Sequence, residues 1–222
     1  MIVKYNKKIR DYKYLISFDL ASHNTGICLW NIEKNKPEKT FLMTTKKTEN
    51  FVYDLYQNLE IFFASLQKDF NIDLKDVFVC KEAMPVQLRG AASTVQTFVA
   101  LAKSHAVLDL FLQQHDIDVY DYTGIYPITT HSYLKKLLSE ENVESVDKNT
   151  IKKYVEQEFN LVVKSYDESD AVFLAVTLIQ SKWNKDILEE MKEIKKHKKE
   201  LIMKNAIAEC EKKIDFLINL TI

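Results

Sequence analysis

Three short apolar runs stand close together near the start of the chain, separated only by short polar segments. They are Tyr14–Asp19, Thr25–Trp30 and Lys39–Thr45, with a break at Lys36-Pro37 before the third. Runs of this length and composition are typical of β-strands, and strands joined by short turns pair as an antiparallel meander. The chain is therefore expected to begin its fold with a sheet of three neighbouring strands.

Helix and strand patterns alternate after this meander. Apolar residues recur every three or four positions along one predicted helix, at Phe51, Leu55, Leu59, Phe62 and Leu66. Further strands are predicted at Val77–Glu82 and Val119–Tyr122, and further helices at Ser93–Gln113, Thr130–Leu138, Lys148–Phe159 and Ala171–Ser181. A meander followed by βαβ units predicts an α/β fold, a five-stranded mixed sheet flanked by helices in the ribonuclease H-like arrangement.

The last part of the chain has a different composition. Residues 183–222 are rich in Lys and Glu, and apolar residues at helical spacing are interrupted by the basic run Lys195–Lys199. No strict heptad persists, so a long coiled coil is not indicated. We expect one domain over residues 1–182 and a C-terminal helical extension over 183–222, packed on the domain or on a second subunit.

Charge and cysteine usage restrict the possible classes of protein. With 31 Lys and Arg against 32 Asp and Glu, the chain is not a simple basic DNA-binding protein, although local charge can still recognise nucleic acid. Cys28, Cys80 and Cys210 lack zinc spacing and are interpreted as reduced cysteines. No secretory pattern is seen in Met1–Lys13, and no apolar run reaches the roughly 20 residues of a membrane span. A cytoplasmic protein without membrane contact is expected.

Four carboxylates occupy positions that are costly for a charge unless something compensates it. Asp19 and Glu82 each end a buried strand, and Asp167 and Asp170 lie three residues apart at a helix start. Taken singly, each has an ordinary explanation, because acids begin turns and cap helices. In the predicted fold the first and fourth strands are neighbours, so the carboxylates are expected to converge. Glu168, in the same run, is expected to point elsewhere.

Convergence of these four groups would predict a metal site. Two carboxylates about 4 Å apart repel by roughly 4 kcal/mol at an effective dielectric near 20, and bound cations offset that cost. Oxygen ligands suit Mg²⁺ or Mn²⁺. Two such ions stabilise the attacking and leaving oxygens of a phosphodiester, with water as the nucleophile. The pattern therefore indicates two-metal-ion hydrolysis of a phosphodiester.

The same residues resemble the motifs of a known family. Phe18–Gly26 (FDLASHNTG), Val77–Glu82 followed by Ala83-Met84-Pro85, and Asp167–Val172 (DESDAV) resemble, in order, the three motifs of RuvC-type Holliday junction resolvases. The resemblance spans about residues 14 to 180 and is greatest to the phage-encoded branch known from lactococcal phages.

This resemblance implies a homodimer that binds four-way DNA junctions and nicks two strands symmetrically, leaving 5′-phosphate and 3′-hydroxyl ends. It implies Mg²⁺ or Mn²⁺, two ions per active site, and no nucleotide cofactor. Asp19, Glu82, Asp167 and Asp170 carry over as catalytic metal ligands. The long helix Ser93–Gln113 carries over as part of the dimer interface.

The chain also departs from the family. Cellular members often carry an aromatic residue in the loop after the glutamate, to probe bases, and residues 83–92 contain none. We therefore expect cleavage of branched DNA with little sequence specificity. Tyr120, Tyr122 and Tyr126 are expected to pack in the core. Candidate DNA-binding residues are Arg89, Gln96, Lys103, Lys135 and Lys136.

Three alternatives remain open. Sugar kinases and actin-like ATPases share the core fold, but they need two domains and glycine-rich loops, and this chain has 222 residues and three glycines. A ribonuclease H-like nuclease acting on RNA or linear DNA is separated by comparing substrates. A catalytically weak junction-binding protein is separated by testing for metal-dependent cleavage.

Overall fold

A computed structural model describes residues 9–46, 48–84, 95–138, 146–180, 196–198, 200 and 203–204. The chain divides into two units, residues 1–180 and residues 181–222. In the second unit every described residue is helical. The domain over residues 1–182 and the C-terminal helical extension over 183–222 stay predictions.

The first unit is built on a five-stranded sheet with the order β3-β2-β1-β4-β5. The strands are β1 (Tyr14–Asp19), β2 (Asn24–Asn31), β3 (Lys36–Thr44), β4 (Val77–Lys81) and β5 (Asp118–Val119). β1 pairs antiparallel with β2 and β2 with β3, whereas β4 runs parallel to β1 and to β5. The predicted mixed sheet, which begins as a meander, is confirmed.

Two strand boundaries differ from the prediction. β3 begins at Lys36 and includes Pro37, which was expected to break the chain. Pro37 is tolerated because β3 is an edge strand, and its partner Trp30 follows a register shift in the ladder. β5 ends at Val119 rather than Tyr122, because the chain turns at Asp121, whose backbone oxygen accepts a hydrogen bond from the Gly124 amide.

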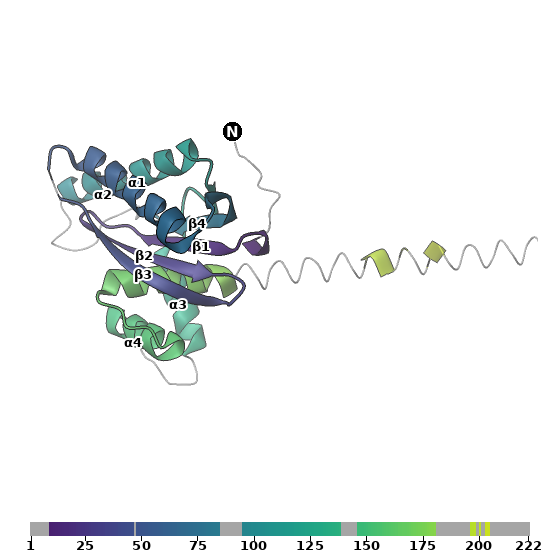
Figure 1. Ribbon diagram of the computed structural model, residues 1–222. Coiled ribbons are helices and arrows are strands. Elements are labelled where there is room, and N and C mark those ends of the chain that lie inside the picture. The colour runs from purple at the N-terminus through teal and green to yellow at the C-terminus, as the bar shows by residue number, and fades with distance from the viewer. Residues whose placement is uncertain are drawn as a thin grey trace, which may run out of the picture. The chain divides into compact units, whose positions relative to one another are not determined.

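Helices cover both faces of this sheet (Figure 1). α1 (Phe51–Phe70) and α2 (Val95–Gln114) lie on one face, and α3 (Pro127–Leu137) and α4 (Lys148–Phe159) lie on the other. A helix over residues 166–180 packs against the sheet on the α3 and α4 side. Two short 3-10 turns, Ile9–Asp11 and Leu74–Asp76, were not predicted.

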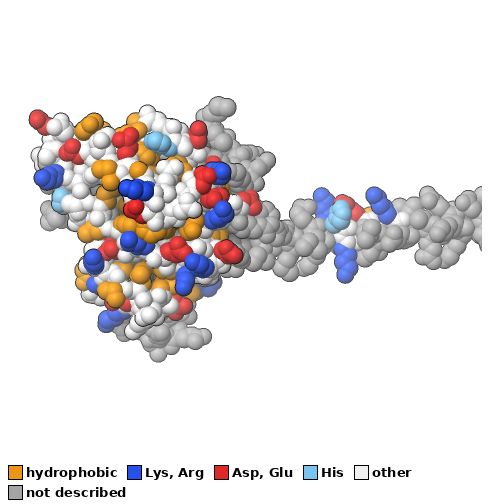
Figure 2. Space-filling view, in the orientation of Figure 1, with side chains coloured by type: hydrophobic (Ala, Val, Ile, Leu, Met, Phe, Trp, Pro, Cys, Tyr) orange, Lys and Arg blue, Asp and Glu red, His pale blue; other side chains and the backbone are white. Residues whose placement is uncertain are grey.

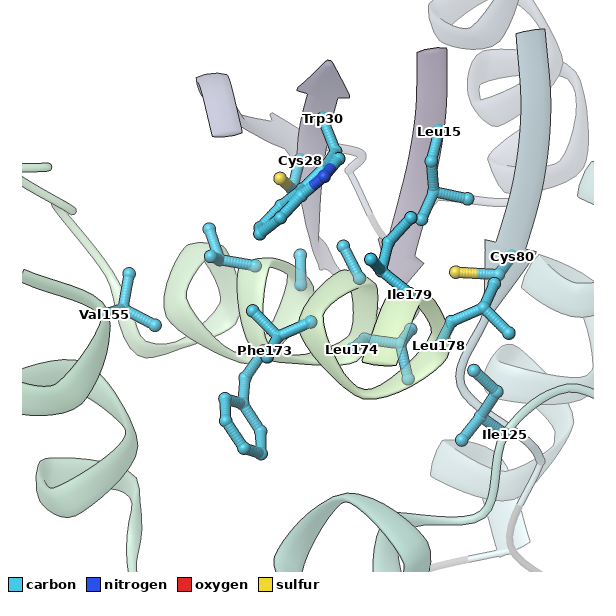
Figure 3. Packing of buried hydrophobic residues seen from close by; sticks show 14 of the residues in the cluster. Leu15, Cys28, Trp30, Cys80, Ile125, Val155, Phe173, Leu174, Leu178 and Ile179 are labelled. Carbon is cyan, nitrogen blue, oxygen red and sulfur yellow. The ribbon is translucent and has the colours of Figure 1, made fainter. Parts of the chain in front are cut away.

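Alternating side chains of each strand enter two separate cores. On β1, Ile16 and Phe18 join the core under α1 and α2, while Leu15 joins the core that contains residues 171–179. Figure 3 shows Cys28, Trp30 and Cys80 from the strands against side chains of that helix, among them Leu174 and Ile179. Because both faces are buried, the strands are nearly continuous apolar runs rather than alternating ones.

Asparagine provides the left-handed positions that end α1 and α4 in this glycine-poor chain. Asn71 (φ 53°) ends α1, and Asn160 (φ 49°) ends α4. Asn is one of the few non-glycine residues that adopt this conformation at modest cost. At its other end, α4 begins at Asp147, whose side chain accepts a hydrogen bond of 2.8 Å from the Thr150 amide. These caps place the first turn of α4 next to the site described below.

Candidate active site

Asp19 and Glu82 lie side by side at the ends of neighbouring strands. The β1–β4 register pairs Phe18 with Lys81, and the Glu82 amide donates a 3.0 Å hydrogen bond to the Phe18 carbonyl. Asp19 and Glu82 are therefore the next pair, on the face of the sheet that carries Leu15 and Cys80. Their carboxyl groups share a hydrogen bond. The adjacency that the fold led us to expect is present.

A glycine brings Asp167 to the same place. Gly26 is the β2 partner of Asp19, and a Cβ atom on Gly26 would overlap the backbone carbonyl of Asp167. The helix containing Asp167 can therefore lie directly on the strand only because residue 26 has no side chain. One turn further along, the buried hydroxyl of Ser17 donates a 2.6 Å hydrogen bond to the carbonyl of Ala171. These contacts hold the start of the helix above Asp19.

The electrostatics of the four carboxylates show that they affect one another. Burial, reinforced by the charges of Glu82, Asp170 and Asp167, holds the pKa of Asp19 well above its usual range. Burial and the charge of Asp170 raise the pKa of Glu82 to about 7, although its hydrogen bond with Asp19 opposes the shift. Burial also raises the pKa of Asp170, with a contribution from Asp167. The structure thus brings all four predicted residues within electrostatic range of one another.

Lys148 is a member of this cluster that the sequence did not reveal. Its ammonium lies 3.3 Å from Oδ2 of Asp170, and its side chain is 62% exposed. Burial lowers the pKa of Lys148, but the charges of Asp170, Asp19 and Asp167 outweigh burial and leave the pKa raised. Its one sequence signal is its place directly after the capping residue of α4, and that signal does not predict where α4 lies.

Glu168 is excluded from the cluster by its contacts, as predicted. Its carboxylate is buried and accepts hydrogen bonds from the amides of Lys164 (2.8 Å) and Ser165 (3.0 Å). The hydroxyl of Thr40 on β3 donates a further bond of 3.0 Å. Glu168 therefore holds the start of the 166–180 helix, while Asp167 and Asp170 on either side of it remain available to the site.

The donor set fits a hard divalent cation, although the side chains do not surround one. Among the described residues, no group of three Asp, Glu, His or Cys side chains stands close enough to hold an ion. Asp170 Oδ1, however, is buried and has no hydrogen-bond partner in the described part of the chain. Carboxylate oxygens are the ligands that Mg²⁺ and Mn²⁺ prefer, so the buried Oδ1 of Asp170 suits such an ion. The two-ion site stays a prediction.

The predicted DNA-binding residues occupy different parts of the surface. Gln96 and Lys103 are exposed on α2, and Lys135 and Lys136 are exposed on α3, whereas Arg89 lies outside the described residues. His131 on α3 also lies near the carboxylates, since its charge opposes the rise that burial causes in the pKa of Asp170. On the face shown in Figure 2, basic side chains are interspersed with acidic ones rather than gathered in one patch.

The tyrosines after β5 do not lie in the core as predicted. Tyr120 is 39% exposed, Tyr122 is 36% exposed and Tyr126 is 50% exposed, although the ring of Tyr120 lies edge-on to Phe78. The prediction was wrong because the strand was expected to continue to Tyr122, whereas the chain turns away from the sheet after Tyr120. Tyr120 still contacts the core, through the ring of Phe78.

α2 carries apolar side chains on both of its sides. Leu108 and Phe111 are buried against α1 and the sheet, while Val95, Val99 and Leu110 are exposed. Of the described helices, α2 alone has the length and hydropathy to cross a membrane, which is weak evidence because core helices pass the same test. The exposed residues recur at helical spacing and form one stripe.

Comparisons with known proteins place this architecture. No protein-family model and no curated protein matches the chain. A Thermus thermophilus RuvC structure matches with a TM-score of 0.51 at 14% identity, covering 74% of this chain and 92% of that one. T. thermophilus RuvC in complex with a Holliday junction substrate matches with a TM-score of 0.49 at 13% identity, covering 75% of this chain and 92% of that one. A fowlpox virus Holliday junction resolvase matches with a TM-score of 0.35 at 14% identity, covering 76% of this chain and 98% of that one.

At such identities a match shows the fold and no more. The five-stranded mixed sheet with helices on both faces is the one expected from the sequence. The chain has the ribonuclease H-like fold, as T. thermophilus RuvC does.

Proposed function

We propose that the protein is a structure-selective endonuclease that resolves Holliday junctions and cuts other branched DNA, with little sequence specificity. This proposal rests on one observation. Asp19 and Glu82 meet the first turn of the 166–180 helix at the carboxyl-terminal ends of β1 and β4. The three sequence motifs, in order on this fold, support a RuvC-type enzyme of the phage-encoded branch, acting in the host cytoplasm.

Asp19, Glu82, Asp167 and Asp170 are the residues that would hold Mg²⁺ or Mn²⁺. When bound, two such ions would supply an activated water and stabilise the leaving oxygen of the phosphodiester. The protein's own part is to keep four carboxylates together at one place. Burial raises the pKa of Asp19 and Glu82, because a buried carboxylate without a bound cation is costly to ionise.

Lys148 is proposed to exchange partners when substrate binds. Its ammonium lies 3.3 Å from the Asp170 carboxylate, and its side chain is exposed enough to turn outwards. With cations on the carboxylates, the ammonium would lose its anionic partner and bind a phosphate oxygen of the DNA instead. Lys135 and His131, four residues apart on α3, would line the same approach.

A homodimer is proposed through the exposed apolar stripe of α2, which contains Val95, Val99 and Leu110. An exposed apolar surface on a long helix is a common interface between two copies of one chain. Two copies would present two carboxylate sites, which symmetric nicking of a junction requires.

The test is a cleavage panel. A labelled four-way junction, a replication fork, a linear duplex and an RNA strand are each incubated with Mg²⁺, Mn²⁺ or EDTA. We expect metal-dependent cutting of the two branched substrates and little cutting of the others. Equal cutting of the duplex or the RNA would replace the proposal with a general ribonuclease H-like nuclease. Tight junction binding without cutting would replace it with a binding protein.

A further inference from the structure

The segment that joins β5 to α3 lies directly beside the strand that carries Glu82. The Ile125 amide donates a 2.9 Å hydrogen bond to the Lys81 carbonyl, and the Ala83 amide donates a 2.8 Å bond to the Ile125 carbonyl. These two bonds pair Ile125 with Glu82 as an isolated parallel bridge. We call residues 120–126 the tyrosine segment.

The tyrosine segment is held at several points along its length. The Asp121 side chain accepts hydrogen bonds from the amide and the hydroxyl of Thr123, both of 2.8 Å. Gly124 (φ 81°) packs so closely on Glu82 and Ala83 that a Cβ atom would lie 2.7 Å from the Glu82 carbonyl oxygen. Tyr126 directly precedes α3, whose first residue is Pro127. The backbone that carries Tyr122 and Tyr126 is therefore fixed relative to Glu82.

Both rings are exposed although their backbone is fixed. Tyr122 is 36% exposed and Tyr126 is 50% exposed, and Ile128 two residues later is 74% exposed. Tyr120, in the same segment, is 39% exposed, but its ring lies edge-on to Phe78. Tyr126 directly follows Ile125, the bridge partner of Glu82, so its backbone lies beside the candidate active site. Two exposed aromatic rings on a fixed backbone beside a candidate nuclease site are a surface on which a planar group can stack.

We propose that Tyr122 and Tyr126 stack on the faces of nucleobases that are left unstacked at the branch point of the DNA. This inference rests on the proposed function and adds the feature of the substrate that the site recognises. In a linear duplex each base is already stacked on its neighbours, so its faces are not available. At a branch point the stack is interrupted, and an exposed base face can meet a tyrosine ring.

Stacking also accounts for branch selectivity without sequence selectivity. Every base has a π-face, so aromatic stacking tolerates any sequence. Phosphate contacts from residues such as Lys135 strengthen binding to all DNA alike and weaken as salt rises. The tyrosines would therefore separate branched from linear DNA, while the lysines set the overall affinity.

The first experiment measures affinity in EDTA, so that no strand is cut, for a four-way junction and for a linear duplex of the same sequence. Tyr122→Ala and Tyr126→Ala are each expected to weaken junction binding by between about 5-fold and 100-fold and to leave duplex binding unchanged. The Tyr→Phe variants should keep wild-type binding, because the ring is retained. Tyr53→Ala is the matched control, since Tyr53 is 65% exposed on α1, on the other face of the sheet. Unchanged duplex binding also shows that the variants are folded.

The second experiment places 5-iododeoxyuridine at the branch point, where irradiation couples it to a stacked aromatic ring. Coupling mapped by mass spectrometry to Tyr122 or Tyr126, on the junction and not on the duplex, supports the proposal. Coupling elsewhere, or alanine variants that bind the junction like wild type, would overturn it. If the stacking proposal is overturned in this way but the wild-type protein still cuts branched DNA, the proposed function is kept without the stacking role. If it neither binds nor cuts branched DNA, the proposed function fails first.

Discussion

At the scale of single residues, protonation of Asp19 and Glu82 makes the stability of the fold depend on pH. The folded pKa of Asp19 lies above its unfolded value, and the pKa of Glu82 is about 7. The folded state thus binds more protons than the unfolded state at mildly acidic pH. This contribution to stability is present below the unfolded pKa values and is lost as pH rises through the folded ones.

Asp19→Asn should therefore lower cleavage activity and raise thermal stability. Junction cleavage should fall by more than the roughly 10–100-fold typical of changes around metal ligands, while junction binding is kept or tightened because repulsion of phosphate decreases. In EDTA at pH 7 to 8, the variant should unfold at a higher temperature than wild type. Thermal melting from pH 5 to 8 checks the expected rise in unfolding temperature. A variant that binds no junction would show instead that Asp19 is structural.

His105 on α2 should make stability depend on pH in the opposite direction to Asp19 and Glu82. Burial and the nearby Lys81 lower the pKa of His105 to about 4, and the side chain is 7% exposed. The unfolded chain binds this proton near pH 6.5, so stability is lost as pH falls from there towards 4, by at most on the order of 3 kcal/mol. Urea unfolding of wild type and His105→Gln between pH 4.5 and 7 should show a flatter curve for the variant. Parallel curves would contradict this assignment.

At the scale of elements, Gly26 sets the distance between β2 and the 166–180 helix. Gly26→Ala would place a methyl group on the Asp167 carbonyl, so the helix start must move. A displacement of about 1 Å can cost about 100-fold in rate. We expect a cleavage loss of that order, with circular dichroism and junction binding close to wild type. Wild-type cleavage by Gly26→Ala would show that the helix position does not matter.

A buried ion pair joins β4 to α2. Lys81 is 1% exposed, and its ammonium contacts the carboxylate of Asp109. Asp109→Asn leaves a buried ammonium without its counter-charge and should lower the free energy of unfolding by about 3 kcal/mol. The double variant Lys81→Met/Asp109→Leu should recover most of that loss. Glu38→Gln, which removes the exposed 2.8 Å pair with Lys34, is the control and should change urea unfolding little.

At the scale of the whole molecule, the apolar stripe on α2 predicts a dimer. Leu110→Glu places a charge in the stripe and should give a monomeric mass by light scattering, with loss of paired nicking. Ile61→Glu is the matched control, because Ile61 is 67% exposed on α1 and is expected to leave the mass unchanged. A wild-type monomer that nicks both strands symmetrically would rule out this interface.

The sheet and the pairing of Asp19 with Glu82 were predictable because they follow from local patterns and from chain order. Apolar runs fix the strands, and the βαβ connection places β4 beside β1. The contact of Lys148 with Asp170 was not predictable, because it depends on how α4 lies across the sheet. Tyr122 and Tyr126 were wrongly predicted to lie in the core. Aromatic residues near a strand end do not show from sequence whether they belong to the strand or to the turn that follows it.

The most direct test of the account concerns the four carboxylates together. Cleavage of a labelled four-way junction in Mg²⁺ is measured for wild type, for the amide variants of Asp19, Glu82, Asp167 and Asp170, and for Glu60→Gln, an exposed acid on α1. The account predicts metal-dependent cutting by wild type and Glu60→Gln and loss of cutting in each of the four amide variants. Cutting by any amide variant at the wild-type rate, or by wild type in EDTA, would contradict it.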